Sequence, residues 1–281
     1  MRSKRVLGTV LTVALTAALA AATTTTHAAA APQALTLTWA DDFDGPAGNA
    51  PDSSKWTNNV GGDGWGNKEL QYYTPGNHNT ALDGEGNLVI TARAENPEGS
   101  SCWYGPCKFS SGRLTTQGKF DQAYGRFEAR MKLPTGKGMW PAFWTMGNDF
   151  KGVNDGWPQC GEIDVMEYIG DEPNTVYGTL HGPGYFDKDG VGGQTNSGSP
   201  LSADFHTYAV DWSPNSVTWS LDGVDYVTKT PSDLPPGKEW VFNHNFFMLL
   251  NFAVGGTMSG NPDNDSQLPQ QMIVDYVHVY S

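Results

Sequence analysis

The chain has 281 residues, of which 12% are aromatic, and its 17 basic and 30 acidic residues give a formal net charge of -13. So many aromatic side chains can bury enough apolar surface to offset chain entropy, which excludes a disordered protein. The acidic balance disfavours nucleic acid as a partner, because an acidic surface repels phosphate. A chain with 34 Gly, 10 Trp and only 17% charged residues indicates one all-β domain of about 250 residues.

Residues 1–30 are typical of a secretory signal peptide that is removed from the mature protein. Basic residues begin this segment, an apolar stretch covers 6–22, and alanines at 28–31 supply a cleavage site. A membrane anchor is the alternative, but the apolar stretch falls short of the ~20 residues that a bilayer span requires. We therefore expect a secreted, extracellular protein with no membrane contact after cleavage, a disordered segment at 31–36 and one domain over 37–281.

Strand patterns recur along this domain, separated by turns rich in Gly, Pro, Asn and Asp. The segments 124–131 and 272–280, for example, carry β-branched or aromatic residues in strand-like order. Asp222-Gly223 stands between two alternating runs within 216–227, which is a strong signal for a hairpin. Because no stretch keeps a helical period over about twelve residues, the pattern predicts a single β-sandwich.

The three cysteines are Cys102, Cys107 and Cys160. The turn at 103–106 would bring Cys102 and Cys107 within bridging distance, and an oxidising compartment favours that disulfide. Cys160 is then expected to be a buried, unreactive thiol, although its pairing with one of the other two stays open. No histidine lies in a suggestive local context, which argues against a catalytic thiol.

Three carboxylates lie within six residues of one predicted strand, at Glu162, Asp164 and Glu167. The residues between them are apolar, which indicates a strand rather than a solvated run of charge. Glu162 and Asp164 share a face, but Glu167 is at an odd offset from Glu162 and would face the other way in a regular strand. One extra residue in a β-bulge near Val165-Met166 would return Glu167 to the shared face.

With such a bulge the two glutamates lie about 13 Å apart along the strand. Side chains that lean together would shorten this to about 5–6 Å, the separation found in retaining glycosidases. Clustered acids cannot all ionise freely, so their pKa values must differ. We predict Glu162 as the ionised nucleophile, Glu167 as the acid and then the base, and Asp164 as their hydrogen-bonded neighbour. The alternatives are an acidic edge strand that deters aggregation and a calcium site.

The pattern Glu-x-Asp-x-x-Glu over 162–167 resembles glycoside hydrolase family 16, in its bacterial endo-1,3-β-glucanase (laminarinase) branch. Further segments resemble that branch in the same order along the chain: 39–45, 65–73, 111–113, 138–144 and 251–256. The resemblance implies a jelly-roll β-sandwich of two antiparallel sheets with a concave substrate cleft, and it makes 37–281 the catalytic domain. It also implies a retaining mechanism that needs no cofactor for catalysis.

By the same resemblance, Asn67, Arg113, Trp140 and Trp144 would bind glucose units on the non-reducing side of the cut, with His181 near the reacting sugar. Trp140 and Trp144 are four residues apart and share a strand face, where their rings would stack on sugar. Without the resemblance, each Trp would be interpreted as core and His181 as a structural histidine.

In many relatives a calcium ion lies on the convex face, away from the cleft. The matching positions here are Asp42, the backbone carbonyl of Gly86, and Asp275, and calcium prefers hard oxygen ligands of this kind. Such an ion would stabilise the fold rather than take part in the reaction. The alternative is that these are ordinary surface acids.

The leading hypothesis is a secreted, monomeric endo-glucanase that cuts internal β-1,3 bonds of laminarin- or curdlan-type glucans, which are its expected partner. An alternative is a mixed-linkage glucanase or another family 16 polysaccharide hydrolase, which would use the same catalytic acids on a different polysaccharide. The bulged spacing disfavours lichenases, which lack the extra residue, but agarases and carrageenases share it. A non-catalytic glucan-binding lectin is disfavoured because all three acids are present. A transglycosylase stays open, since sugar can intercept the covalent intermediate in place of water.

Overall fold

The computed structural model describes residues 35–152 and 155–281, and the predicted signal peptide lies outside them. Leu35–Ser281 forms one compact unit. Its helical segments, within the described residues, are four short 3-10 turns at Pro97–Gly99, Asp187–Asp189, Pro231–Asp233 and Asp265–Gln267. In the described part of the chain no helix has the length and apolar character needed to cross a membrane. The expectation of an all-β protein is therefore confirmed.

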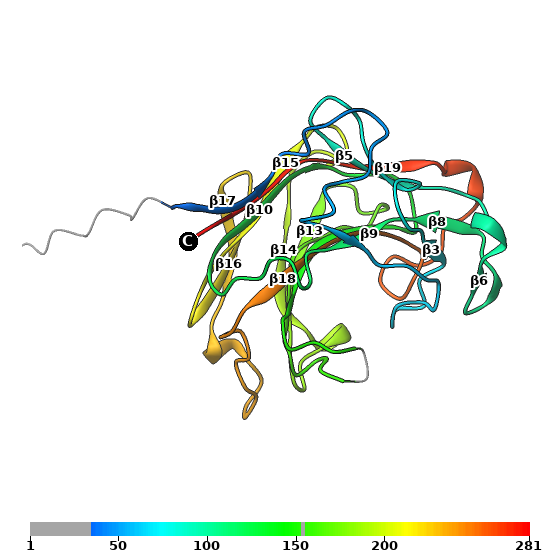
Figure 1. Cartoon of the computed structure of the whole chain (residues 1–281). Coiled ribbons are helices and arrows are strands. Elements are labelled where there is room, and N and C mark those ends of the chain that lie inside the picture. The colour runs from blue at the N-terminus through cyan, green and yellow to red at the C-terminus, as the bar shows by residue number, and fades with distance from the viewer. Residues whose placement is uncertain (1–34, 153–154) are drawn as a thin grey trace, which may run out of the picture. The chain divides into compact units, whose positions relative to one another are not determined.

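One sheet contains eight antiparallel strands. They are β1 (Leu37–Asp41), β4 (Thr80–Leu82), β5 (Leu88–Ala92), β10 (Gly125–Lys132), β15 (His206–Ser213), β16 (Ser216–Leu221), β17 (Val224–Lys229) and β19 (Gln270–Tyr280). Their order is β17-β16-β15-β10-β19-β5-β4, and β1 joins by pairing with β19. This sheet forms the upper layer in Figure 1.

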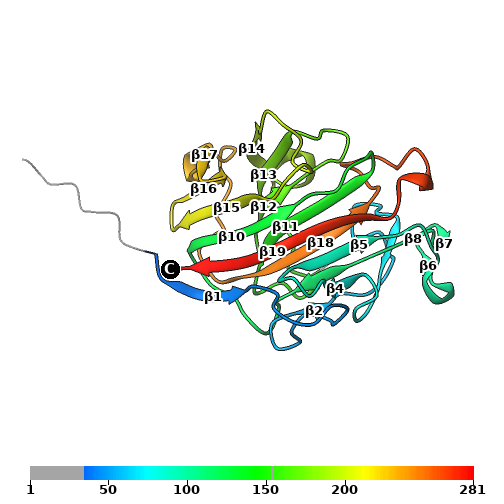
Figure 2. The same ribbon diagram turned by 90° about the horizontal axis from the view of Figure 1, so that it is seen from above.

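The other sheet carries the predicted catalytic strand. It consists of β2 (Thr57–Asn58), β9 (Arg113–Thr115), β11 (Met139–Gly147), β12 (Glu162–Glu167), β13 (Thr175–His181), β14 (Val191–Asn196) and β18 (Phe246–Val254), in the order β14-β13-β12-β11-β18-β9-β2. Two short pairs complete the fold: β3 (Gln71–Tyr73) lies parallel to β8 (Phe109–Ser111), and β6 (Ser101–Cys102) pairs with β7 (Gly105–Pro106). Figures 1 and 2 show the two large sheets stacked as the sandwich that the strand pattern predicts.

Two local features test the sequence expectations directly. The hairpin at Asp222-Gly223 is present, and both residues adopt the positive φ angles (51° and 76°) that a tight two-residue turn requires. Of the segment 31–36, expected to be disordered, residues 31–34 lie outside the described residues. Thr36, directly before β1, exchanges two backbone hydrogen bonds of 2.9 Å with Ser281.

The central strands β11 and β18 are buried on both faces. Met139 and Phe143 point into the core between the sheets, whereas Ala142, Trp144 and Met146 belong to a second apolar cluster on the opposite face. Side chains of a strand alternate between its faces, so the second cluster forms the floor of the face that lies away from the core. The predicted catalytic residues lie on this face, together with Arg113, Trp140, Trp144 and His181.

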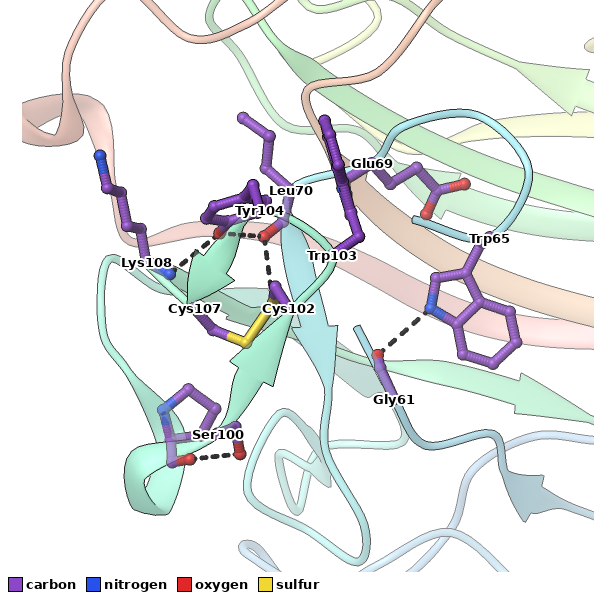
Figure 3. The surroundings of a disulfide bond; sticks show 11 residues. Gly61, Trp65, Glu69, Leu70, Ser100, Cys102, Trp103, Tyr104, Cys107 and Lys108 are labelled. Carbon is purple, nitrogen blue, oxygen red and sulfur yellow. Dashed lines mark hydrogen bonds between the residues drawn. A yellow bond between two sulfur atoms is a disulfide. The ribbon is translucent and has the colours of Figure 1, made fainter. Parts of the chain in front are cut away.

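The cysteines follow the first of the two alternatives that the sequence left open. Cys102 and Cys107 form a disulfide across the β6–β7 hairpin (Figure 3). Cys160 is a buried free thiol, and burial raises its pKa to about 12. A thiol with such a raised pKa is a poor nucleophile at neutral pH, which agrees with a structural role.

Candidate active site

The register of β12 brings its three carboxylates to one face. Against β11, Asp164 pairs with Trp144 but Met166 pairs with Phe143, so Val165 is an extra residue. The pairing with β13 is interrupted between Asp164 and Glu167 as well. The predicted β-bulge at Val165-Met166 is therefore confirmed. Ile163, Val165 and Met166 pack into the core, and the three acids point the other way.

The same register assembles the remaining face. Glu162 lies opposite Met146 on β11 and opposite His181 on β13, while Glu167 lies opposite Ala142. Ala142 in turn lies opposite Asn251 of β18, which lies opposite Arg113 of β9. Residues directly opposite in neighbouring strands project to the same side of the sheet. The catalytic candidates, His181 and Arg113 thus share one face across five strands.

Each glutamate receives a hydrogen bond from a tryptophan. The indole Nε1 of Trp157 donates to Glu162 Oε2 at 2.8 Å, and the indole Nε1 of Trp140 donates to Glu167 Oε1 at 3.1 Å. Both glutamates are half-buried. The indoles fix the rotamers of the two carboxylates and favour their ionised forms.

Burial dominates the ionisation of the cluster. Burial and then the neighbouring charge of Asp164 raise the pKa of Glu162 to about 8, and the same two causes raise that of Glu167 to about 8. Burial raises the pKa of Asp164 to about 7. Because all three pKa values are raised, the cluster retains protons near neutral pH, as a site that needs one acid and one carboxylate requires.

Asp164 is held between the two glutamates by buried contacts. Its side chain lies 3.0 Å from His181 Nε2, and its backbone carbonyl accepts a 2.7 Å hydrogen bond from Trp219 Nε1. Donor atoms of Glu162, Asp164 and His181 lie within 4.8 Å of one another, and among the described residues this is the one such group with spacing suited to a metal ion.

Asp164→Asn is expected to shift the pH profile of hydrolysis to lower pH. The Asp164 charge raises the pKa of both glutamates, so its removal lowers both. The rate at the optimum should fall by about 10–10²-fold, less than the 10²–10⁴-fold typical of losing a general acid. Initial rates on a soluble glucan between pH 4 and 9 would measure this. An unchanged profile would show that Asp164 does not set the ionisation of its neighbours.

The sugar-binding candidates form one connected wall. Trp144 Nε1 donates to Asn251 Oδ1 at 2.7 Å, and the Arg113 guanidinium lies 4.8 Å from the centre of the Trp144 ring. Arg113 also lies 4.6 Å from the Trp65 ring. Trp140 is 8% and Trp144 9% exposed, so little of either side chain is open to solvent in the free protein. Both rings lie on the predicted face and chiefly hold its charged groups.

A buried carboxylate that sequence reasoning did not assign organises this wall. Glu69 is 3% exposed, and it accepts hydrogen bonds from Asn67 (3.3 Å), Gln71 (2.6 Å) and Tyr73 (2.9 Å). Tyr73 in turn accepts a hydrogen bond from Asn251. Burial raises the pKa of Glu69. The network positions Asn67 without touching the three catalytic candidates.

The predicted calcium residues lie outside this face. The Asp42 carboxylate accepts a 2.7 Å hydrogen bond from His278, and the Asp275 carboxylate pairs with Arg130. Gly86 lies beside Asp42, since a Cβ on Gly86 would be 3.8 Å from the Asp42 backbone oxygen. These hard oxygen donors suit calcium, although the ion would compete with two basic side chains.

Comparisons with known proteins point to one family. The model of the family described as "Glycosyl hydrolases family 16" matches residues 66–276. A Rhodothermus marinus protein named "Beta-glucanase" is 39% identical over 251 residues, which cover 87% of this chain and 84% of the relative. A Cryptopygus antarcticus protein named "Glucan endo-1,3-beta-glucosidase" is 42% identical over 243 residues, 82% of this chain and 84% of the relative.

A solved structure is similar over almost the same extent. The catalytic domain of an endo-1,3-beta-glucanase (laminarinase) from Thermotoga petrophila RKU-1 matches with a TM-score of 0.80 at 43% identity, covering 88% of this chain and 98% of that one. Sequence, fold and the arrangement of the acidic strand thus lead to the same assignment. The chain belongs to glycosyl hydrolase family 16.

Proposed function

We propose that the protein is a retaining endo-β-1,3-glucanase that hydrolyses internal bonds of laminarin- or curdlan-type glucans. The observation that carries the proposal is the bulged strand β12, which turns Glu162, Asp164 and Glu167 to the face of the sheet that also carries Arg113 and Trp140. Relatives named as beta-glucanase and endo-1,3-beta-glucosidase, at 39% and 42% identity, support the choice of glucan.

The reaction has two steps on opposite faces of the sugar. In the first, a Glu162 carboxylate oxygen attacks the anomeric carbon while Glu167 gives its proton to the departing glycosidic oxygen, which breaks the bond and leaves a glycosyl ester on Glu162. In the second, Glu167 takes a proton from water, whose oxygen attacks the same carbon and releases Glu162. Two inversions restore the original β configuration.

The neighbouring contacts suit these roles. The Trp157 indole, 2.8 Å from Glu162, would hold that carboxylate in line and stabilise its negative charge before attack. The first step requires a proton on Glu167, which the raised pKa of that carboxyl favours. It also requires an ionised Glu162, which the Trp157 hydrogen bond favours against the burial that raises the pKa of Glu162. Asp164, whose carboxylate lies 3.0 Å from His181 Nε2, would hold its position between the two glutamates through both steps.

The product profile on three polymers tests this function. We expect rapid release of a ladder of short oligosaccharides from laminarin, slower release from barley mixed-linkage glucan and none from agarose. Preference for the mixed-linkage polymer would keep the catalytic acids and change the specificity assigned to Asn67 and Arg113. Laminarin binding without cleavage of any polymer would instead support a glucan-binding lectin.

We further propose that the protein is exported and acts as a soluble monomer outside the cell. The N-terminal signal at 1–30 and the Cys102–Cys107 disulfide, which persists in oxidising compartments, support export. N-terminal sequencing of the protein from culture medium would test cleavage, expected after a residue between 28 and 31. Light scattering of the purified protein would test the monomer.

A structural calcium ion is also proposed, bound by Asp42, the Gly86 carbonyl and Asp275. Calcium at a hundred times its dissociation constant should stabilise the fold by about 2.7 kcal/mol, which raises Tm by about 5–10 °C in a domain of this size. Thermal unfolding with calcium, with magnesium and with chelator would measure this, and Asp275→Asn should remove the gain. Equal Tm values in calcium and chelator would contradict the site.

A further inference from the structure

Trp103 is an exposed aromatic side chain with no role in the catalytic face. It is 49% exposed, whereas Trp140 and Trp144 are 8% and 9% exposed. It lies at the tip of the β6–β7 hairpin, between the two cysteines of the disulfide. A single exposed apolar side chain needs no special explanation. What sets Trp103 apart is that two hydrogen bonds and a contact with the Tyr104 ring hold it in place.

Trp103 is fixed against the segment that precedes β3. Its indole Nε1 donates to the Glu69 carbonyl at 2.8 Å, and its backbone N–H donates to the Gly62 carbonyl at 2.8 Å. Gly64 lies against the ring, since a Cβ at that position would be 2.9 Å from Trp103 Cδ1. Gly64 also has a φ of 87°, which glycine adopts without strain. The ring therefore has a fixed position and orientation while half of it faces solvent.

The hairpin that carries the ring is itself anchored (Figure 3). The Cys102–Cys107 disulfide closes it, and the Tyr104 hydroxyl donates to the Leu70 carbonyl at 2.6 Å. The same hydroxyl accepts a 3.0 Å hydrogen bond from the backbone N–H of Lys108. The Tyr104 ring meets the Trp103 ring edge-on at 5.5 Å. A rigid hairpin lowers the conformational entropy lost when a ligand binds to the exposed ring.

The segment under Trp103 is the one that carries Asn67 and Trp65. Asn67 donates to the Glu69 carboxylate at 3.3 Å, while the backbone carbonyl of Glu69 accepts the Trp103 indole. Figure 1 shows β6 and β3 at the same end of the sandwich. Trp103 is thus joined through Glu69 to the segment that holds Asn67.

We propose that Trp103 is an outer glucan-binding residue. It stacks on a glucose ring of the glucan that lies farther along the polysaccharide than the glucose units bound at Asn67 and Arg113. This rests on the proposed β-glucanase function. An exposed indole presents a flat apolar face to the C–H face of a glucose ring, and aromatic stacking of this kind contributes modest affinity at each contact. The site favours long glucans over short oligosaccharides, because only a long chain reaches Trp103.

Binding of laminari-oligosaccharides of two to eight glucose units tests this inference. Calorimetry on a Glu162→Gln background measures affinity without turnover, with and without Trp103→Ala. We expect equal affinities for the shortest ligands and an affinity about three- to tenfold weaker for the longest ligands when Trp103 is lost. Trp103→Phe, which keeps an aromatic ring, should retain most of the gain with length.

Two outcomes would overturn the inference. Equal affinities of Glu162→Gln and Glu162→Gln/Trp103→Ala for oligosaccharides of every length would show that Trp103 does not touch the glucan. An equal loss at all lengths, including the shortest, would show that Trp103 only supports the Asn67 segment. Cys102→Ser/Cys107→Ser, which keeps the ring and frees the hairpin, should lose part of the affinity for long ligands alone. If the wild-type protein binds these ligands in this manner but cleaves no glucan, the proposed hydrolase function fails and the Trp103 site stands.

Discussion

Glu162→Gln is expected to lower the hydrolysis of laminarin by about 10⁴-fold or more, while the protein keeps its fold. The amide has the shape of the carboxylate but cannot form the glycosyl ester, so the first step is lost. The Trp157 indole, 2.8 Å from Glu162 Oε2 in the wild type, can still donate to the amide oxygen. Steady-state release of reducing sugar would measure the loss. Glu85→Gln, on an exposed glutamate in the turn before β5, is the matched control and should keep the wild-type rate.

The same variant should be more stable than the wild type at neutral pH. The folded pKa of Glu162 is raised to about 8 from 4.5, so the folded state retains a proton that the unfolded chain releases. Stability is therefore lost as the pH rises from about 4.5 to about 8. Because Glu162 is only half-buried, we expect a gain of about 1–2 kcal/mol, or about 2–8 °C in Tm at pH 7, that disappears near pH 4.

Retention of more than a tenth of the wild-type rate by Glu162→Gln would show that another group attacks the sugar. A Tm at pH 7 equal to that of the wild type would show instead that the site tolerates the ionised carboxylate without cost. The two measurements separate the chemical role of Glu162 from the electrostatic cost of burying it. Function and stability make opposite demands at this position, as is common at active sites.

The bulge in β12 could be predicted because the sequence itself marks both faces of that strand. Ile163, Val165 and Met166 are apolar, and the acids between and beside them fit a single polar face only if one residue is extra. The structure confirms this register. When one face of a strand is polar and the other apolar, the sequence predicts which face is buried. A break in the alternation then predicts a β-bulge.

The central strands β11 and β18 show no such alternation of polar and apolar residues. All nine residues of β11 and all nine of β18 are buried, and both sequences are almost entirely apolar. With no alternation, the sequence does not tell which side chains face the core and which face the site. The roles of Trp140, which donates to Glu167, and Asn251, which accepts from Trp144, depend on contacts between strands that only the fold reveals.

The contacts of Glu69 and Trp157 could not be predicted from the sequence for a similar reason. An isolated glutamate in a polar loop is normally exposed, yet Glu69 is buried by partners from β3 and from its own loop. Trp157 reaches Glu162 from the loop between β11 and β12, five residues away in sequence. Loop conformation decides both contacts, and local sequence patterns specify loops less well than strands.

Glu167→Ala is expected to slow hydrolysis of laminarin by about 10²–10⁴-fold, the usual contribution of a general acid and base. The loss should be much smaller in the first step for an aryl glucoside with a good leaving group, because such a group departs without a proton. The glycosyl ester on Glu162 then accumulates, since no base activates water. A burst of released phenol followed by a slow steady rate would measure this.

Azide distinguishes the roles of the two glutamates, because the product depends on which side chain is missing. In Glu167→Ala, azide attacks the glycosyl ester in place of water, and two inversions give a β-glycosyl azide. In Glu162→Ala, azide enters the space left by the side chain and attacks the substrate directly, so one inversion gives an α-glycosyl azide. NMR of the products reads the anomer. A β-azide from Glu162→Ala and an α-azide from Glu167→Ala would exchange the two roles, and an α-azide from both would point to an inverting enzyme.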